Sequence, residues 1–181
     1  GSGTFLIEAA HIAMDRAPGL RRGFAFERWP DHDADGWQAQ RSEAEARWEA
    51  GRTRELVIHG ADAHKGAVAL ARKAIVDAEV ATTVQVRRRP LDRHEPLIPP
   101  TLVVANPPWG QRIGTEDHAA TWTDLGAFLK AHCAGATAWL LSGSPELTKP
   151  LRMRADERVP VRIGPVDARF IRYSIRAKED A

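Results

Sequence analysis

The chain has 181 residues, of which 43% are hydrophobic and 28% are charged, and its formal net charge at pH 7 is +2. This composition is that of a globular domain with one sizeable core, and no apolar run approaches the roughly 18–20 residues that a membrane-spanning helix needs. Because Cys133 is the single cysteine, an internal disulfide and a cysteine-rich zinc site are excluded. We therefore expect a cytoplasmic protein with neither a membrane nor a metal partner.

The first part of the chain predicts two helices and an insertion. Residues 5–14 carry apolar side chains at helical spacing, and the Ala-Pro-Gly sequence at 17–19 ends this helix. Residues 18–52 predict an irregular, aromatic insertion that closes with a helix from about Asp35 to Ala50, stopped by Gly51.

Strands and helices then alternate. Residues 55–62 predict a short strand, and residues 64–80 predict a helix. On the apolar face of that helix we expect Val68, Ala71, Ile75 and Val76. The remaining pattern predicts strands at 82–87, 101–106 and 136–143, a helix at 121–133, a helix capped by Ser144, and a final antiparallel hairpin formed by 157–164 and 168–177.

This order of elements predicts an α/β fold with a mostly parallel sheet and helices on both faces. The C-terminal hairpin makes the sheet mixed. We find no internal repeat, so a single domain is the simplest organisation. Arginines gather in Val86–Arg93 and Lys149–Arg162. Such clusters are compatible with a polyanionic partner, although each taken alone is more often solvated surface.

Ligands of such a sheet bind at the carboxyl ends of its strands, and two small segments there suit a nucleoside cofactor. Gly1, Ser2, Gly3 and Thr4 open a helix whose free N–H groups a ligand can approach, although the segment is equally compatible with a simple turn. Asp62 ends a strand and can accept both hydroxyls of a ribose, or it can cap the helix that follows.

The third segment, Asn106–Gly110, contains the sequence Asn-Pro-Pro-Trp. The two prolines fix two φ angles and supply carbonyls without a competing N–H. The Asn106 oxygen and the Pro107 carbonyl can accept the two hydrogens of an exocyclic amine, while Trp109 stacks on the ring that bears it. Orienting the amine in this way favours its attack on an electrophile. The alternative is a structural turn, made rigid by Pro107 and Pro108, that caps a strand.

Together these motifs resemble the S-adenosylmethionine-dependent methyltransferases that modify exocyclic amines. The resemblance is closest to the bacterial 23S rRNA guanine-N2 methyltransferases that carry a THUMP-type RNA-binding domain upstream. It rests on GSGTFLIEAA, on GAD at 60–62, on NPPWGQRIG, and on longer stretches at 15–29 and 142–170. It implies a Rossmann-like class I fold with seven strands and a reversed last hairpin.

The resemblance also assigns roles. Gly1, Ser2, Gly3 and Thr4 would lie under the methionine part of S-adenosylmethionine, Asp62 would hold the ribose, and Ala63 would lie beside the adenine. Asn106, Pro107, Pro108 and Trp109 would hold the guanine. Gly110 and Arg112 would contact the RNA, although Arg112 is also compatible with a surface salt bridge.

Some positions depart from the family pattern. The family has a strand before the glycine-rich loop, which this chain lacks, so we expect residues 1–181 to be an N-terminally truncated methyltransferase domain with a gap in its sheet. Arg88 stands where the family usually has an acid beside the adenine, and His64 replaces a second acid after Asp62.

Two alternatives to a 23S rRNA guanine-N2 methyltransferase follow. The target amine could be adenine N6 or a protein glutamine, because all of these suit an Asn-Pro-Pro-aromatic pocket. The chain could also be a non-catalytic RNA-binding module whose cofactor site has decayed, which Arg88 and the absent strand would explain.

Overall fold

The computed structural model of the chain describes residues 1–109 and 118–176. The chain divides into two compact units, Gly1–Arg88 (unit 1) and Arg89–Ala181 (unit 2). The α/β prediction is confirmed, with parallel strand pairs and a C-terminal antiparallel hairpin. The strands are distributed over two sheets, however, where the sequence predicted one: β1-β2 in unit 1 and β3-β4-β6-β5 in unit 2.

Unit 1 packs its helices around a small core next to the two-stranded parallel sheet. The core combines residues from α1 and α3 with the insertion residue Trp48, which is fully buried. On α3, Val68, Ala71 and Ile75 are buried as predicted, but Val76 is 64% exposed. The elements are α1 (Thr4–Ala13), η1 (Ala25–Arg28), α2 (Ala34–Gly51), β1 (Ile58–Asp62), α3 (Lys65–Asp77) and β2 (Val84–Arg88).

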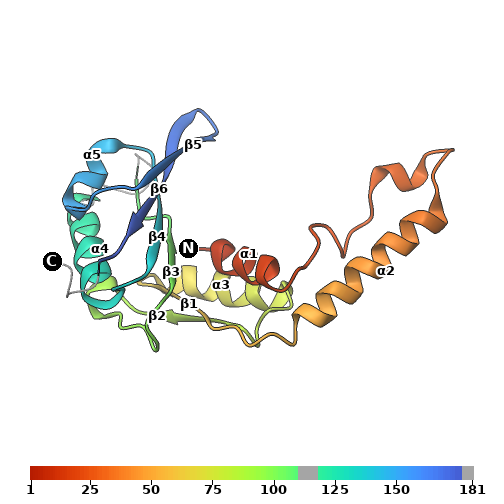
Figure 1. Cartoon of the computed structure of the whole chain (residues 1–181), viewed down its shortest axis with the longest axis horizontal. Coiled ribbons are helices and arrows are strands. Elements are labelled where there is room, and N and C mark those ends of the chain that lie inside the picture. The colour runs from red at the N-terminus through yellow and green to blue at the C-terminus, as the bar shows by residue number, and fades with distance from the viewer. Residues whose placement is uncertain (110–117, 177–181) are drawn as a thin grey trace. The chain divides into compact units, whose positions relative to one another are not determined.

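The insertion forms the turn and helix that the sequence predicted. Asp33 caps α2 by accepting a hydrogen bond from the Gly36 amide at 2.9 Å. Gly51 does not stop the helix but forms its last residue. Of the α2 residues, only Trp48 and Gly51 are buried, so the helix projects from the rest of unit 1 (Figure 1). Trp29, in the loop before α2, is 64% exposed.

Unit 2 is a mixed four-stranded sheet with α4 against one face. β3 runs parallel to β4, β4 runs antiparallel to β6, and β6 forms the predicted hairpin with β5. Ser144 caps the short α5 through the Glu146 amide, as predicted. The elements are η2 (Leu91–Arg93), β3 (Leu102–Ala105), α4 (His118–His132), β4 (Thr137–Ser142), α5 (Pro145–Thr148), η3 (Lys149–Leu151), β5 (Glu157–Ile163) and β6 (Val166–Ser174).

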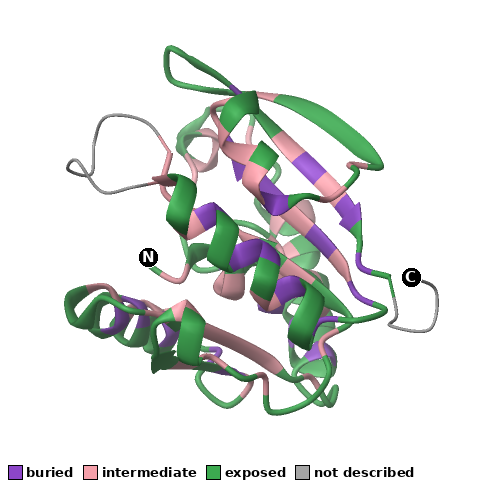
Figure 2. Cartoon of the chain, turned by 90° about the vertical axis from the view of Figure 1, so that its left-hand side faces the viewer, coloured by how far each residue is buried: buried purple, intermediate pink, exposed green. Residues whose placement is uncertain are grey.

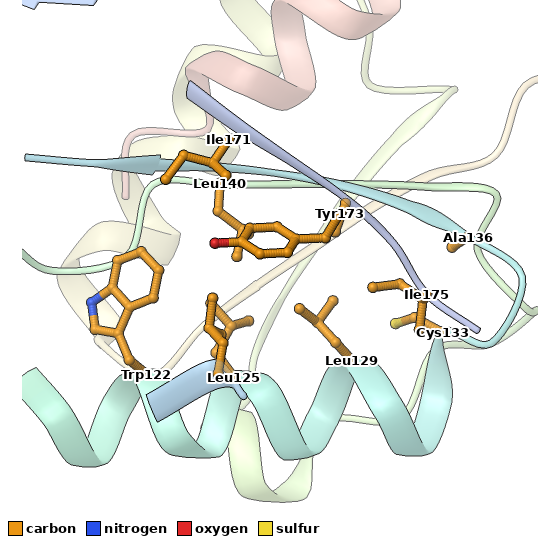
Figure 3. Close-up of a cluster of buried hydrophobic side chains, with 11 residues drawn as sticks. Trp122, Leu125, Leu129, Cys133, Ala136, Leu140, Ile171, Tyr173 and Ile175 are labelled. Atoms are coloured by element: carbon orange, nitrogen blue, oxygen red, sulfur yellow. The ribbon is translucent and has the colours of Figure 1, made fainter. Parts of the chain in front are cut away.

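The core of unit 2 lies between α4 and the sheet. Figure 3 shows Trp122 and Leu129 pointing from α4 toward Leu140 and Tyr173 on the strands. Burying side chains of this size contributes about 1.5–3 kcal/mol each. Trp139, in the strand predicted at 136–143, lies half-buried on the opposite face, because successive residues of a strand alternate sides.

Candidate functional site

The glycine-rich loop forms a tight entry to α1. Gly3 has a φ of 80° and is the N-cap residue of the helix. A Cβ on Gly3 would lie 3.1 Å from the Cβ of Ala71, so the loop backbone rests closely on α3. The Ser2 and Thr4 hydroxyls are 2.8 Å apart. No side chain caps α1, and the Gly3 carbonyl accepts the Leu6 and Ile7 amides at 3.0 and 3.1 Å, so the positive end of the helix dipole lies at this loop.

Asp62 lies at the end of β1, next to this loop. Its Oδ1 accepts a hydrogen bond from the His64 amide at 2.7 Å. Burial alone would raise the pKa of Asp62, but hydrogen bonds to the carboxylate, the one from the His64 amide among them, lower the pKa. The carboxylate is therefore ionised at neutral pH. The residue that caps α3 is His64, not Asp62, because the Ala67 amide donates to His64 Nδ1 at 3.3 Å.

Arg88 stands beside the same strand end. It pairs with Asp62 in the parallel β1–β2 register, and its Nε donates to the Ala63 carbonyl at 3.2 Å. The departure from the family pattern thus places a guanidinium next to Ala63. An ionised acceptor for a diol and the open start of a helix occur together in unit 1, and these features fit a nucleoside with a charged tail, such as S-adenosylmethionine.

The Asn-Pro-Pro-Trp turn follows β3 in unit 2 and is held by an internal hydrogen bond. Trp109 Nε1 donates to Asn106 Oδ1 at 2.7 Å. An indole nitrogen is only ever a donor, so this bond fixes which end of the Asn106 amide is the oxygen. A carbonyl oxygen has two acceptor sites, and the bond with Trp109 uses one. Since Asn106 is exposed, its oxygen can still accept an external donor.

A second hydrogen bond anchors the turn to the core. Trp122, which is fully buried on α4, donates from Nε1 to the Pro108 carbonyl at 3.2 Å. Among the described residues, the Pro107 carbonyl accepts no hydrogen bond. The turn therefore places the Pro107 carbonyl next to the Asn106 side chain, and their role as acceptors for an amine stays a prediction.

Gly143, just after β4, supports the indole of Trp109. A Cβ on Gly143 would lie 2.3 Å from Trp109 Cε3, so only glycine allows this approach. Sequence reasoning identified neither Gly143 nor Trp122 as part of the site. Both lie in elements that it predicted, but no sequence signal links either of them to the turn at Asn106–Trp109.

Other predicted features are placed as follows. Gly110 and Arg112 lie outside the described residues. Cys133 is fully buried, as expected for a core residue. Within 1–109 and 118–176, no three His, Cys, Asp or Glu side chains are grouped so as to hold a metal ion. In the same ranges, no helix has both the length and the apolar character that crossing a membrane requires.

Unit 1 thus contains the residues predicted for a nucleoside cofactor, and unit 2 contains those predicted to hold a planar amine, which is the combination expected of an amine methyltransferase. A family model described as "RMKL-like, methyltransferase domain" matches residues 1–171. The chain belongs to this family, and the resemblance inferred from its sequence is confirmed.

Individual relatives agree with this assignment. The chain is 35% identical to the "Ribosomal RNA large subunit methyltransferase K/L" of Chromohalobacter salexigens over 98% of its own length and 25% of that protein. It is 37% identical to the protein of the same name from Cellvibrio japonicus, covering 97% of the chain and 24% of the relative. The chain therefore spans about a quarter of the length of these relatives.

Solved structures share the fold. The crystal structure of SMU.472 complexed with SAH aligns with a TM-score of 0.89 and 26% identity, covering 98% of this chain and 46% of that one. A predicted N6-adenine-specific DNA methylase from Listeria monocytogenes aligns with a TM-score of 0.83 and 25% identity, covering 97% and 44%. These neighbours confirm the Rossmann-like class I methyltransferase fold.

Proposed function

We propose that this chain transfers a methyl group from S-adenosylmethionine to the exocyclic N2 amine of a guanine in 23S rRNA. The observation that carries the proposal is the pair of acceptors at Asn106 and Pro107, with the Asn106 oxygen oriented by the Trp109 indole at 2.7 Å. The relatives named as large-subunit rRNA methyltransferases support rRNA as the substrate.

The cofactor would be held by residues of unit 1. Gly1, Ser2, Gly3 and Thr4 would receive its methionine part at the open start of α1, where backbone N–H groups favour a carboxylate. Asp62, ionised at neutral pH, would accept the ribose hydroxyls, and Ala63 would lie beside the adenine. When bound, S-adenosylmethionine supplies a methyl group on a positively charged sulfur.

The turn in unit 2 would prepare the amine. The lone pair of a guanine amine is delocalised into the ring, so the amine is a poor nucleophile. Acceptors at Asn106 and Pro107 would hold its two hydrogens and stabilise the positive charge that develops as the N2–carbon bond forms and the carbon–sulfur bond breaks. The surplus amine proton then leaves to solvent. Trp109 would stack on the base, a contact worth about 1–3 kcal/mol.

The target guanine must be unpaired or flipped out of its helix, because a stacked base cannot reach such a turn. Gly110 and Arg112 would extend the contact with the RNA. We further propose that an upstream THUMP-type domain of the same protein selects the RNA in the cytoplasm.

One specific observation favours an alternative substrate. A structural relative at 25% identity is described as a predicted N6-adenine-specific DNA methylase, and adenine N6 is also an exocyclic amine that two acceptors can hold. A third candidate is a non-catalytic RNA-binding module, favoured by Arg88, whose guanidinium donates to the Ala63 carbonyl next to the proposed cofactor residues.

A single assay separates the three functions. The protein is incubated with methyl-labelled S-adenosylmethionine and unmodified 23S rRNA made by transcription in vitro, and the RNA is digested to nucleosides. Label in N2-methylguanosine that disappears with Asn106→Ala supports the proposal. Label in N6-methyladenosine shifts the substrate to adenine. A protein that binds the RNA but neither transfers label nor binds S-adenosylhomocysteine supports the non-catalytic module.

A further inference from the structure

The β5–β6 hairpin carries three exposed arginines that form no ion pair with any residue of the described ranges 1–109 and 118–176. Arg158 and Arg162 on β5 and Arg169 on β6, here called the hairpin arginines, are all exposed, and Figure 2 shows how open β5 is to solvent. Among the described residues, none of the three has a carboxylate oxygen within 4.0 Å. Three exposed guanidinium groups are thus available to an anionic partner.

The hairpin arginines share one face of the sheet. In the antiparallel register, Arg158 lies opposite Ile171, and Arg169 lies two residues from Ile171 along β6. Directly opposed residues and alternate residues of a strand point to the same side. Arg162, four residues from Arg158, therefore lies on this side as well. It lies opposite Asp167, so the face carries three positive charges and one negative charge.

This face adjoins the proposed base-binding turn. Arg169 lies opposite Ser142 across the β4–β6 pair, and both line a hollow of about 40 Å³ with Gly143. Gly143 in turn touches Trp109, since a Cβ there would lie 2.3 Å from the indole. Only the short turn after β4 therefore separates Arg169, the hairpin arginine on β6, from Trp109.

Half of the arginines of the insertion in unit 1 form ion pairs. Arg21 pairs with Glu45 at 2.7 Å, Arg47 with Glu43 at 2.9 Å, and Arg52 with Glu49 at 3.1 Å. Neighbouring carboxylates cancel much of the attraction of these three groups for a polyanion. The other three insertion arginines have no ion pair among the described residues, so the place of the hairpin beside Trp109, and not pairing alone, favours it as the surface that meets RNA.

We propose that the hairpin arginines bind the phosphate backbone of the RNA next to the target base. This inference rests on the proposed function, because it takes the turn at Asn106–Trp109 as the place where the base is held. A guanidinium matches phosphate oxygens with two parallel hydrogen bonds, and a β-strand holds successive arginines at a fixed spacing. Arg169, nearest to Trp109, contacts the phosphate closest to the flipped base.

The test compares two triple variants with the same change in charge. Arg158→Gln/Arg162→Gln/Arg169→Gln removes the hairpin arginines, and a matched variant replaces Arg21, Arg47 and Arg52 by Gln in unit 1. Fluorescence anisotropy measures binding of a mixed-sequence RNA of about 20 nucleotides, a length that exceeds typical single-strand sites. Each titration is repeated between about 50 and 200 mM salt.

We expect the hairpin variant to bind RNA at least 10-fold more weakly at low salt. The slope of log affinity against log salt should become shallower by about 0.7 per lost phosphate contact, or about 2 in total. The matched variant should keep the wild-type slope, and Arg169→Lys should keep most of it because the charge remains. S-adenosylhomocysteine affinity should be unchanged in all variants, and the melting temperature should be unchanged in the hairpin variant, whereas the matched variant loses surface ion pairs and should melt at a somewhat lower temperature.

Equal losses in the two triple variants would overturn the inference, because net charge alone would then explain binding. So would an unchanged slope in the hairpin variant, or a wild-type chain that does not bind RNA. The binding measurement needs no methyl transfer, so its result can be told apart from a failure of the proposed reaction. A chain that binds RNA through the hairpin but methylates no nucleoside would refute the proposed reaction and leave the RNA surface standing.

Discussion

Replacing Gly143 by alanine should displace Trp109 and slow methyl transfer without weakening cofactor binding. The added Cβ would lie 2.3 Å from Trp109 Cε3 and 2.6 Å from Cζ3. Ordinary contact begins near 3.4 Å, so the indole must move by about 1 Å. Gly143 does not have a positive φ, and alanine therefore adds no backbone strain of its own.

The expected loss of activity depends on whether the backbone at Gly143 or the side chain of Trp109 moves to relieve the clash. Moving the backbone of the turn after β4 would disturb a packed sheet, at a cost of about 1–3 kcal/mol. Trp109 is only half-buried, so its side chain moves more readily. A displacement of about 1 Å in a group that positions the substrate lowers the catalytic rate by up to about 100-fold. We expect kcat to fall about 10- to 100-fold while the affinity for S-adenosylhomocysteine is retained.

The assay measures single-turnover methylation of 23S rRNA for Gly143→Ala, Trp109→Phe and the double variant. Phenylalanine lacks the part of the indole that holds Cε3 and Cζ3, so in the Trp109→Phe background Gly143→Ala should cost little more. Gly23→Ala is the matched control, because its Cβ would meet only Glu27 Oε1, at 3.8 Å. An equal loss from Gly143→Ala in both backgrounds would refute the proposed collision with the indole.

Three further outcomes follow. Trp122→Phe keeps a buried aromatic ring but removes the hydrogen bond to the Pro108 carbonyl, so kcat should fall. Thermal melting followed by circular dichroism should show a loss of about 1 kcal/mol in the free energy of unfolding. An unchanged kcat would contradict the anchoring role. Burial raises the pKa of Cys133 to about 11, so iodoacetamide at pH 8 should modify it only in denaturant, as mass spectrometry can check. The hydrogen bond from the Ser174 hydroxyl lowers the pKa of Asp156, so its stabilising effect is present above about pH 4 and is lost as the pH falls through the lowered pKa. The difference in melting temperature between Asp156→Asn and the wild type should therefore be constant from pH 7 to 5 and shrink below pH 4, and a difference that persists there would count against this reading.

Much of the fold could be predicted from the sequence because local patterns decide it. Ser144 and the proline after it begin α5, and apolar spacing on α3 places Val68, Ala71 and Ile75 in the core. Val76 follows Ile75 directly, so it is rotated by about 100° around the helix and lies outside the buried face.

Contacts between residues that are far apart in the chain could not be predicted from the sequence. The apolar composition of residues 136–143 predicts the strand β4, but whether Trp139 is buried depends on which face of β4 meets α4, and the sequence of the strand alone does not reveal that. Likewise, the support of Trp109 by Gly143 joins residues that are 34 positions apart. The types of residue in the site were visible in sequence, whereas the groups that hold them in place were not.

The bond between Trp109 and Asn106 explains why an amide can serve as an acceptor here. An asparagine amide rotates easily, and in the wrong orientation its NH₂ would face the substrate's NH₂, donor against donor. The indole N–H can only donate, so it favours the orientation with the oxygen toward the turn. A bond worth about 1 kcal/mol shifts two such orientations roughly fivefold. Because the oxygen can accept a second bond, Trp109 selects the productive form of Asn106 without occupying the position that the amine needs.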